Sequence, residues 1–204
     1  MNRLRTSLLE KKTKSPVEAE LLDGVAADLL ERAENEWAAT RLEAALQAHR
    51  SGRHVPEHWH WDWRKKSAKL NLLAYRCFAL ECRGGIQGLM MVSTATCVAR
   101  LEPDKGKPLV YIDYLESAPW NVRELCEEPR FGGVGVRLFE AAVQFSKAEG
   151  FFGRVGLHSL PQSESFYEGT CRTTRLAPDQ AAQGLVYFEL TRKSAEEFLE
   201  GGTP

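Results

Sequence analysis

The stretch Arg130-Phe-Gly-Gly-Val-Gly-Val136 stands between an apolar run at 110–115 and a helical segment at 134–147. Glycines at a strand-to-helix junction let the backbone approach a ligand closely, because no Cβ stands in the way. The first amides of a helix have no partner within the helix and carry the positive end of its dipole. The stretch therefore predicts an anion-binding loop that suits a phosphate group.

Two common phosphate loops do not fit this stretch. A P-loop requires lysine and then serine or threonine after its last glycine, whereas Val136 and Arg137 follow Gly135. A dinucleotide-binding fold requires G-x-G-x-x-G early in a βαβ unit. Here the pattern is G-G-x-G and it comes late in the chain. A glycine-rich turn that merely begins a core helix is the alternative at this point.

The composition is that of an ordinary globular protein. The 204 residues are 43% hydrophobic and 27% charged, with a formal net charge of -1, and this length predicts one domain with an extension. The near-zero charge argues against a general nucleic-acid binder. No apolar run approaches the roughly 18 residues of a membrane span, and the basic start of the chain lacks the apolar core of a signal peptide. We expect no membrane association.

Cysteine usage indicates the compartment. Five cysteines occur, at positions 77, 82, 97, 126 and 171, and no two of them form a C-x-x-C pair. An odd number without a pairing motif is typical of reduced thiols. The sequence therefore predicts a cytoplasmic protein.

The N-terminal part of the chain is expected to be helical, after a frayed basic arm over residues 1–14. Ser15-Pro-Val-Glu18 places serine, proline and glutamate where an N-cap, the first helical position and a capping box require them. Apolar residues then recur at helical spacing. A second helical run is expected over 36–49, either separate or continuous with the first. Residues 15–69 are predicted to pack on the same domain as the rest.

A segment rich in histidine and tryptophan, Arg53–Trp63, follows these helices. His58 and His60 could share a face, but their spacing matches no zinc signature, so no metal site is expected. Trp59, Trp61 and Trp63 either line an acceptor pocket or attach the helical layer to a sheet edge. The sequence leaves both roles open.

From Leu70 the pattern changes to strands. The runs 71–82 and 86–94 flank Arg83-Gly84-Gly85, which is typical of a hairpin. The run 109–117 is rich in β-branched and aromatic residues. A strand at 154–160 follows the helix at 134–147, so it is expected to lie parallel to 109–117. Further elements are expected at 96–101, 161–168, 185–191 and 195–200.

This order of elements resembles the GNAT superfamily of acyl-CoA N-acyltransferases. Three stretches carry the resemblance: Tyr114-Leu-Glu-Ser-Ala-Pro119, Arg130-Phe-Gly-Gly-Val-Gly135 and Ser163-Glu-Ser-Phe-Tyr167. The second matches the family's pyrophosphate loop, Arg/Gln-x-x-Gly-x-Gly/Ala, at every position. The connector between Pro119 and Arg130 is longer than in the family, and Leu160 stands where the family often has asparagine. These departures concern the acceptor side.

The resemblance implies an α/β (α+β) fold with a mixed, mostly antiparallel central sheet. One parallel strand pair would splay apart, helices would cover both faces, and the N-terminal helices would form an extension. Residues 70–191 would be the acyltransferase core and residues 192–204 a C-terminal helix and tail. The implied function is transfer of an acetyl group from acetyl-CoA to a primary amine by direct attack, without a metal. The acceptor would be a small molecule or a peptide, and exposed sheet edges would allow a homodimer.

The resemblance also implies roles for particular residues. Tyr167 matches the general acid that protonates the leaving thiolate. For the general base, Glu116 is the first candidate, His158 the second and water the third. A catalytically weak acyl-CoA-binding or protein-interaction module on the same fold is the alternative to an enzyme. The residues expected to bind the cofactor are Leu115, Glu116, Ser117, Arg130, Phe131, Gly132, Gly133, Val134, Gly135 and Val136.

Overall fold

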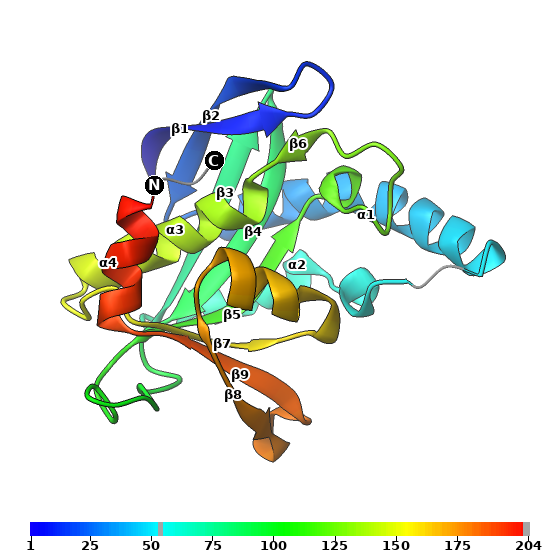
Figure 1. The fold of residues 1–204 in the computed structure, drawn as a ribbon. Helices are drawn as coiled ribbons and strands as arrows, with labels where there is room; N and C mark the ends of the chain where they lie inside the picture. Colours follow the sequence, from blue (N-terminus) through cyan, green and yellow to red (C-terminus); the bar gives the residue numbers. More distant parts are fainter. Residues whose placement is uncertain (53–54, 202–204) are drawn as a thin grey trace. The chain divides into compact units, whose positions relative to one another are not determined.

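The computed structural model describes residues 1–52 and 55–201, and the chain forms two compact units. The first comprises 1–90 and 115–138, and the second comprises 91–114 and 139–204. The strands are ordered β6-β1-β2-β3-β4-β5-β7-β9-β8 in one sheet (Figure 1). They are β1 (Asn2–Glu10), β2 (Ser15–Asp23), β3 (Tyr75–Cys82), β4 (Gly85–Ser93), β5 (Val110–Ser117), β6 (Phe131–Gly132), β7 (Val155–Ser159), β8 (Thr174–Asp179) and β9 (Leu185–Leu190).

The helices are mostly short, apart from α1 and α3. The α-helices are α1 (Ala27–Arg50), α2 (Trp63–Lys66), α3 (Val134–Ala148) and α4 (Arg192–Glu200). Single helical turns are η1 (Glu57–His60), η2 (Ser67–Asn71), η3 (Pro119–Asn121), η4 (Pro161–Ser163), η5 (Phe166–Thr170) and η6 (Gln180–Ala182). Within the described residues, no helix combines the length and the apolar character needed to cross a bilayer.

The expectation for the N-terminus was wrong. Residues 2–10 are not a frayed arm but strand β1, and the segment that begins at Ser15 is strand β2 rather than a helix. β2 pairs along its whole length with β1 and also with β3. A capping box contributes only about 1 kcal/mol, so pairing on both edges outweighs it. Pro16 is tolerated because it stands at the beginning of the strand.

The helix expected over 36–49 is confirmed, and it is part of α1, which begins at Ala27. Its Trp37 is fully buried and donates a hydrogen bond from Nε1 to the Ile86 carbonyl, at 3.1 Å, which attaches α1 to β4. The hairpin between β3 and β4 is also confirmed. Its turn places Arg83 at φ 53° and Gly84 at φ 76°, the positive angles that a two-residue hairpin turn requires. Arg53 and His54 lie outside the described residues.

A close approach in the first unit explains one glycine of β4. A Cβ on Gly88 would lie 2.5 Å from Val134 Cγ1, 2.9 Å from Leu138 Cδ1 and 3.3 Å from the Glu116 carbonyl oxygen. The first turn of α3 and the end of β5 therefore both lie against this glycine. Any side chain at this position would push them away. In this way the sheet positions the segment after the glycine loop.

The second unit contains the parallel pair that the sequence predicts. β5 and β7 are parallel, and their pairing runs from Val110–Val155 to Ile112–Leu157. β7 pairs antiparallel with β9, and β9 with β8, a strand that the sequence did not reveal. The strand proposed over 96–101 is reduced to a single bridge between Val98 and Pro108. The mixed, mostly antiparallel sheet with one parallel pair is thus confirmed.

Candidate active site

The glycine loop is held by the N-terminal strand. β6 pairs antiparallel with β1, with Gly132 opposite Leu9 and Phe131 opposite Glu10. The Lys11 amide donates to the Arg130 carbonyl at 2.9 Å. The Phe131 amide donates to Asn121 Oδ1, also at 2.9 Å. These bonds fix the start of the loop, so the Phe131 amide is already used and the amides that face a ligand must come later.

The first turn of α3 has free amides. The first bond of the helix runs from the Arg137 amide to the Gly133 carbonyl, at 3.0 Å. Within the described chain, no hydrogen bond engages the amides of Val134, Gly135 and Val136. Gly133 has φ 87°, and a Cβ built on it meets nothing within 4 Å. Unpartnered amides beside open space at a helix N-terminus suit an anion.

Two cations lie beside this loop. Arg130 Cζ is 5.0 Å from the centre of the Trp120 ring. The Lys11 side chain crosses Gly132, because a Cβ there would come within 2.7 Å of Lys11 Cε and 3.0 Å of its Nζ. The sequence assigned Lys11 to the frayed arm and so missed it. The run of lysines at 11, 12 and 14 was the available signal, but only the pairing of β1 with β6 brings it to the loop.

The end of β5 carries three predicted site residues. Leu115 and Ser117 are half-buried, whereas Glu116 is buried. Glu116 Oε1 lies 3.2 Å from Arg41 Nη2, and its Oε2 accepts a hydrogen bond from Trp63 Nε1 at 2.6 Å. Arg41 also pairs with Glu34, at 3.1 Å, and donates to the Trp61 carbonyl. Both carboxylate oxygens of this candidate base are therefore occupied.

This closed cluster shifts the protonation of its members. Burial raises the pKa of Glu116 to about 7, while the charge of Arg41 and the hydrogen bond from Trp63 oppose the rise. Burial also lowers the pKa of Lys66 to about 8, against the attraction of Glu116 and Glu34. A carboxyl with a pKa near 7 has the right strength for a base. At 3% exposure, however, the residue offers a substrate little access.

The three tryptophans of the 53–63 segment differ in their roles. Trp63 is fully buried, and its amide donates to Glu34 at 3.0 Å, so it attaches this segment to α1 and β5. Trp61 is half-buried, with Lys66 Nζ 4.5 Å above its ring. Trp59 is 44% exposed. Within the described residues, no group of three histidine, cysteine, aspartate or glutamate side chains could hold a metal ion.

In the second unit, β5 and β7 part after three residue pairs. Their pairing ends at Ile112–Leu157, although both strands continue through Tyr114 and Ser159. On its other side, β7 pairs with β9, and this pairing includes His158 and Ser159. Beyond that last pair lies what we call the opening between the two strands. This is the splay that the family resemblance implies.

His158 lies on β7 at this opening. Its Nδ1 is 2.7 Å from Tyr111 Oη, and its Nε2 is 3.2 Å from Asp179 Oδ2. Burial lowers the pKa of His158, and the hydrogen bond to Asp179 opposes this. The ring is therefore neutral at pH 7, which is the form that accepts a proton. The sequence identified His158 but neither partner, because both are distant in the chain.

Tyr167 lies in the turn η5 and is 7% exposed. Its ring packs against Phe139 and Phe188, at 6.2 and 6.1 Å between centroids. Burial raises the pKa of its phenol, so the group is protonated at neutral pH. Within the described residues, no hydrogen bond engages its hydroxyl. A protonated and unengaged phenol is what a general acid requires.

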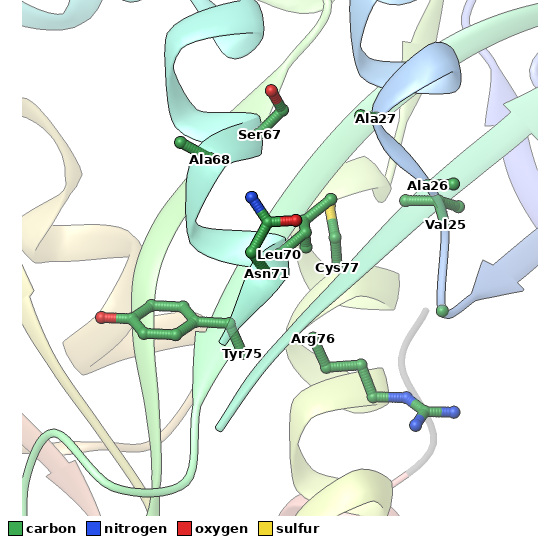
Figure 2. Close-up of a pocket in the computed structure, with 11 residues that line it drawn as sticks. Val25, Ala26, Ala27, Ser67, Ala68, Leu70, Asn71, Tyr75, Arg76 and Cys77 are labelled. Carbon is green, nitrogen blue, oxygen red and sulfur yellow. The ribbon is translucent and has the colours of Figure 1, made fainter. Parts of the chain in front are cut away.

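A cavity of about 500 Å³ lies in the first unit, between the start of α1, the turn η2 and the start of β3 (Figure 2). Figure 2 shows the side chains of Tyr75 and Arg76 extending to opposite sides of their strand. Arg76 is held by Asp23, at 2.9 Å. None of the predicted site residues lines this cavity, whose walls are Gly24, Val25, Ala26, Ala27, Ser67, Ala68, Leu70, Asn71, Tyr75, Arg76 and Cys77.

No family model and no curated protein matches the sequence. Solved structures do match. The GNAT domain of PAT from S. lividans aligns with a TM-score of 0.54 and 12% identity, over 91% of this chain and 96% of that one. PaiA N-acetyltransferase from Thermoplasma acidophilum, solved in complex with coenzyme A, aligns with a TM-score of 0.51 and 11% identity, over 85% and 98%. A bacterial toxin aligns with a TM-score of 0.50 and 18% identity, over 70% and 82%. The chain therefore has the fold of GNAT N-acyltransferases.

Proposed function

We propose that this protein transfers an acyl group from a coenzyme A thioester to an amine. The donor is acetyl-CoA, and the acceptor is a primary amine on a small molecule or a peptide. The observation that carries the proposal is the set of unpartnered amides at Val134, Gly135 and Val136, beside open space at Gly133. The fold supports it, because one similar structure, PaiA N-acetyltransferase, is solved in complex with coenzyme A.

The cofactor's diphosphate is bound at the start of α3 in this proposal. The amides of the first turn point along the helix axis, and the helix dipole favours negative charge there. Lys11 and Arg130 add positive charge at the same loop. The pantetheine arm then runs along the half-buried Leu115 and Ser117, where a backbone amide polarises the thioester carbonyl. A donor of this kind typically contributes about 10²–10³ in rate.

Tyr167 acts as the general acid in this proposal. The amine attacks the thioester carbonyl and the bond to sulfur breaks, so that a thiolate leaves. The phenol gives its proton to that thiolate and regains one from solvent. The base that first removes the proton from the acceptor ammonium is Glu116 or His158. The closed surroundings of Glu116 count against it.

The binding part is tested by placing a charge at the loop. Gly133→Asp is expected to weaken CoA binding at least 10²-fold, since each charge-assisted hydrogen bond is worth about 1.5–3 kcal/mol. Gly84→Asp is the matched control. Gly84 also has a positive φ, 76°, and a Cβ there also meets nothing within 4 Å. Titration calorimetry with CoA measures both variants, and equal affinity in the two would refute the assigned loop.

The catalytic part is tested with Tyr167→Phe. This variant is expected to bind acetyl-CoA with nearly wild-type affinity but to turn over roughly 10²–10⁴-fold more slowly. Turnover is followed as thiol release with a panel of amines. An unchanged rate would show that Tyr167 is not the acid. Tight CoA binding without turnover on any amine would instead favour an acyl-CoA-binding module.

We also propose that the protein is cytoplasmic and forms a homodimer. All five cysteines are free thiols, which fits a reducing compartment such as the cytoplasm. The acyltransferase core is assigned to residues 70–191. Strand β1 lies outside that core but also holds the glycine loop, because it pairs with β6. A homodimer is proposed as the assembly, and sedimentation velocity would test it.

A further inference from the structure

A chain of three polar side chains crosses one face of the second unit. Tyr111 comes from β5, His158 from β7 and Asp179 from the end of β8. The Tyr111 hydroxyl lies 2.7 Å from His158 Nδ1, and His158 Nε2 lies 3.2 Å from Asp179 Oδ2. A carboxylate can only accept, so the Nε2–H donates to Asp179. Nδ1 is then free to accept from the Tyr111 hydroxyl.

The acidic end of this chain is firmly held. Asp179 Oδ2 also accepts from Arg100 Nη2 at 2.8 Å, and its Oδ1 accepts from the Ala181 amide at 3.0 Å. The hydrogen bond from Arg100 is the largest cause that lowers the pKa of Asp179, so this carboxyl stays ionised. An ionised and oriented carboxylate fixes the tautomer of the imidazole and stabilises its protonated form.

The phenolic end of the chain lies where β5 and β7 part. Tyr111 is opposite Gly156, one residue pair before the last pair, Ile112–Leu157. Tyr111 is half-buried, in contrast to Glu116. Tyr111 and His158 therefore lie on the two strands that part here, Tyr111 just before their last residue pair and His158 just after it.

Further titratable groups surround these three side chains. The Tyr187 ring lies 5.0 Å from the His158 ring, and Arg100 Cζ lies 3.8 Å from the Tyr187 ring. Cys97 and Asp113 add negative charge when ionised and raise the pKa of Tyr111, after burial as the main cause. The phenol therefore stays protonated, so it can only relay a proton and cannot store a charge.

We propose that Tyr111, His158 and Asp179 form the proton-accepting chain that prepares the acceptor amine. The inference rests on the proposed acyl transfer and names its base. The acceptor ammonium gives a proton to Tyr111 Oη while the hydroxyl's own proton moves to His158 Nδ1. The neutral amine then attacks the acyl carbonyl. The imidazolium, held by Asp179, returns its proton to solvent after the thiolate has left.

The pH dependence of turnover tests this chain. With the best amine of the panel, His158→Gln and Tyr111→Phe are each expected to lower kcat roughly 10²-fold, with KM for acetyl-CoA unchanged. His158→Gln should also remove the acidic limb of the kcat profile. Asp179 raises the pKa of His158, so Asp179→Asn should move that limb to lower pH. If all three variants kept the wild-type kcat and the wild-type acidic limb of the pH profile, the inference would be overturned.

Tyr187→Phe is the matched control. Its hydroxyl is buried and has no hydrogen-bond partner among the described residues, while its ring lies 5.0 Å from the His158 ring, closer than the 5.8 Å of the Tyr111 ring. Removing that hydroxyl should leave the pH profile unchanged. A loss as large as that of Tyr111→Phe would mean that packing around His158, and not proton transfer, explains both effects.

A second measurement does not depend on turnover. Nitrogen-15 chemical shifts of the His158 ring should show the Nε2–H tautomer at pH 7 and a pKa below the ordinary 6.5, and Tyr111→Phe should change the Nδ1 shift. An Nδ1–H tautomer, or titration above 6.5, would overturn the inference. If CoA binds but no amine is acylated, the proposed function fails. The nitrogen-15 shifts still show whether Tyr111, His158 and Asp179 are hydrogen-bonded as inferred. If CoA does not bind, the proposed function fails at the glycine loop.

Discussion

Two clusters of charged side chains, one in each compact unit, contain a candidate base. In the cluster around Glu116, every carboxylate oxygen is engaged by Arg41 or Trp63, and the residue is 3% exposed. In the chain around His158, the ring is hydrogen-bonded to the half-buried Tyr111, and the Asp179 side chain is 21% exposed. The carboxylate of the first cluster is fully engaged, whereas the second cluster ends on the half-buried hydroxyl of Tyr111.

The difference shows that a suitable pKa is not enough to identify a base. The pKa of Glu116 rises to about 7 mainly because the carboxyl is buried. The same burial removes it from contact with an acceptor. Perturbed pKa values occur both at catalytic sites and in structural ion-pair networks, and access separates the two. We therefore expect the closed cluster to govern stability and the open chain to govern turnover.

The largest expected effect is on the closed cluster. Arg41→Met leaves Glu34 and Glu116 buried without their counter-charge, and removing one partner of a buried ion pair costs about 3–5 kcal/mol. Urea unfolding measures the loss. Arg64→Met serves as the control, because its pair with Asp62 is half exposed and screened by solvent, so its loss should be much smaller. Equal losses in the two variants would show that the cluster is not structural.

A second prediction concerns how stability depends on pH. The folded pKa of Glu116 is above its unfolded value of 4.5, so its contribution is complete below pH 4.5 and is lost as the pH rises through 7. Glutamine mimics the protonated carboxyl. Glu116→Gln should therefore gain stability relative to the wild type between pH 4.5 and 7.5, as measured by thermal unfolding. A constant difference across that range would show that the carboxyl is not protonated on folding.

The smallest expected effect is on the open chain. Asp179→Asn should change the free energy of unfolding far less than Arg41→Met does, because its ion pair with Arg100 is partly exposed and screened by solvent. Turnover should fall nevertheless. If the free energy of unfolding in urea fell as much as it does in Arg41→Met, then Tyr111, His158 and Asp179 would be structural as well. The two clusters would then not differ in role.

Local patterns led to most of the fold after residue 70. The hairpin at Arg83–Gly84, the helix after the glycine loop and the parallel strand after it all follow from patterns within a few residues. The N-terminal error has the same origin. Ser15–Glu18 satisfies a capping pattern locally, but alternating Arg3 and Arg5 face Glu20 and Glu18 across a strand pair. That cross-strand charge pattern was a readable signal.

The residues of the candidate site also fall into those that the sequence could identify and those that it could not. The glycine loop, Tyr167 and His158 could be named from sequence, since their neighbours in the chain carry the signal. Lys11 and Asp179 could not be named, because Lys11 reaches the loop through the pairing of β1 with β6, and Asp179 reaches His158 through β9, which pairs with both β8 and β7. The closure of Glu116 by Arg41 and Trp63 was equally hidden, since these three residues are far apart in the chain.

The sequence by itself determined the glycine loop, the helix that follows it and the parallel strand after that helix, because these depend on backbone freedom and short-range periodicity. Only the tertiary structure decided that the N-terminus joins the sheet and which candidate base is open. Strand pairing and burial depend on residues brought together from the whole chain. No local pattern records those contacts.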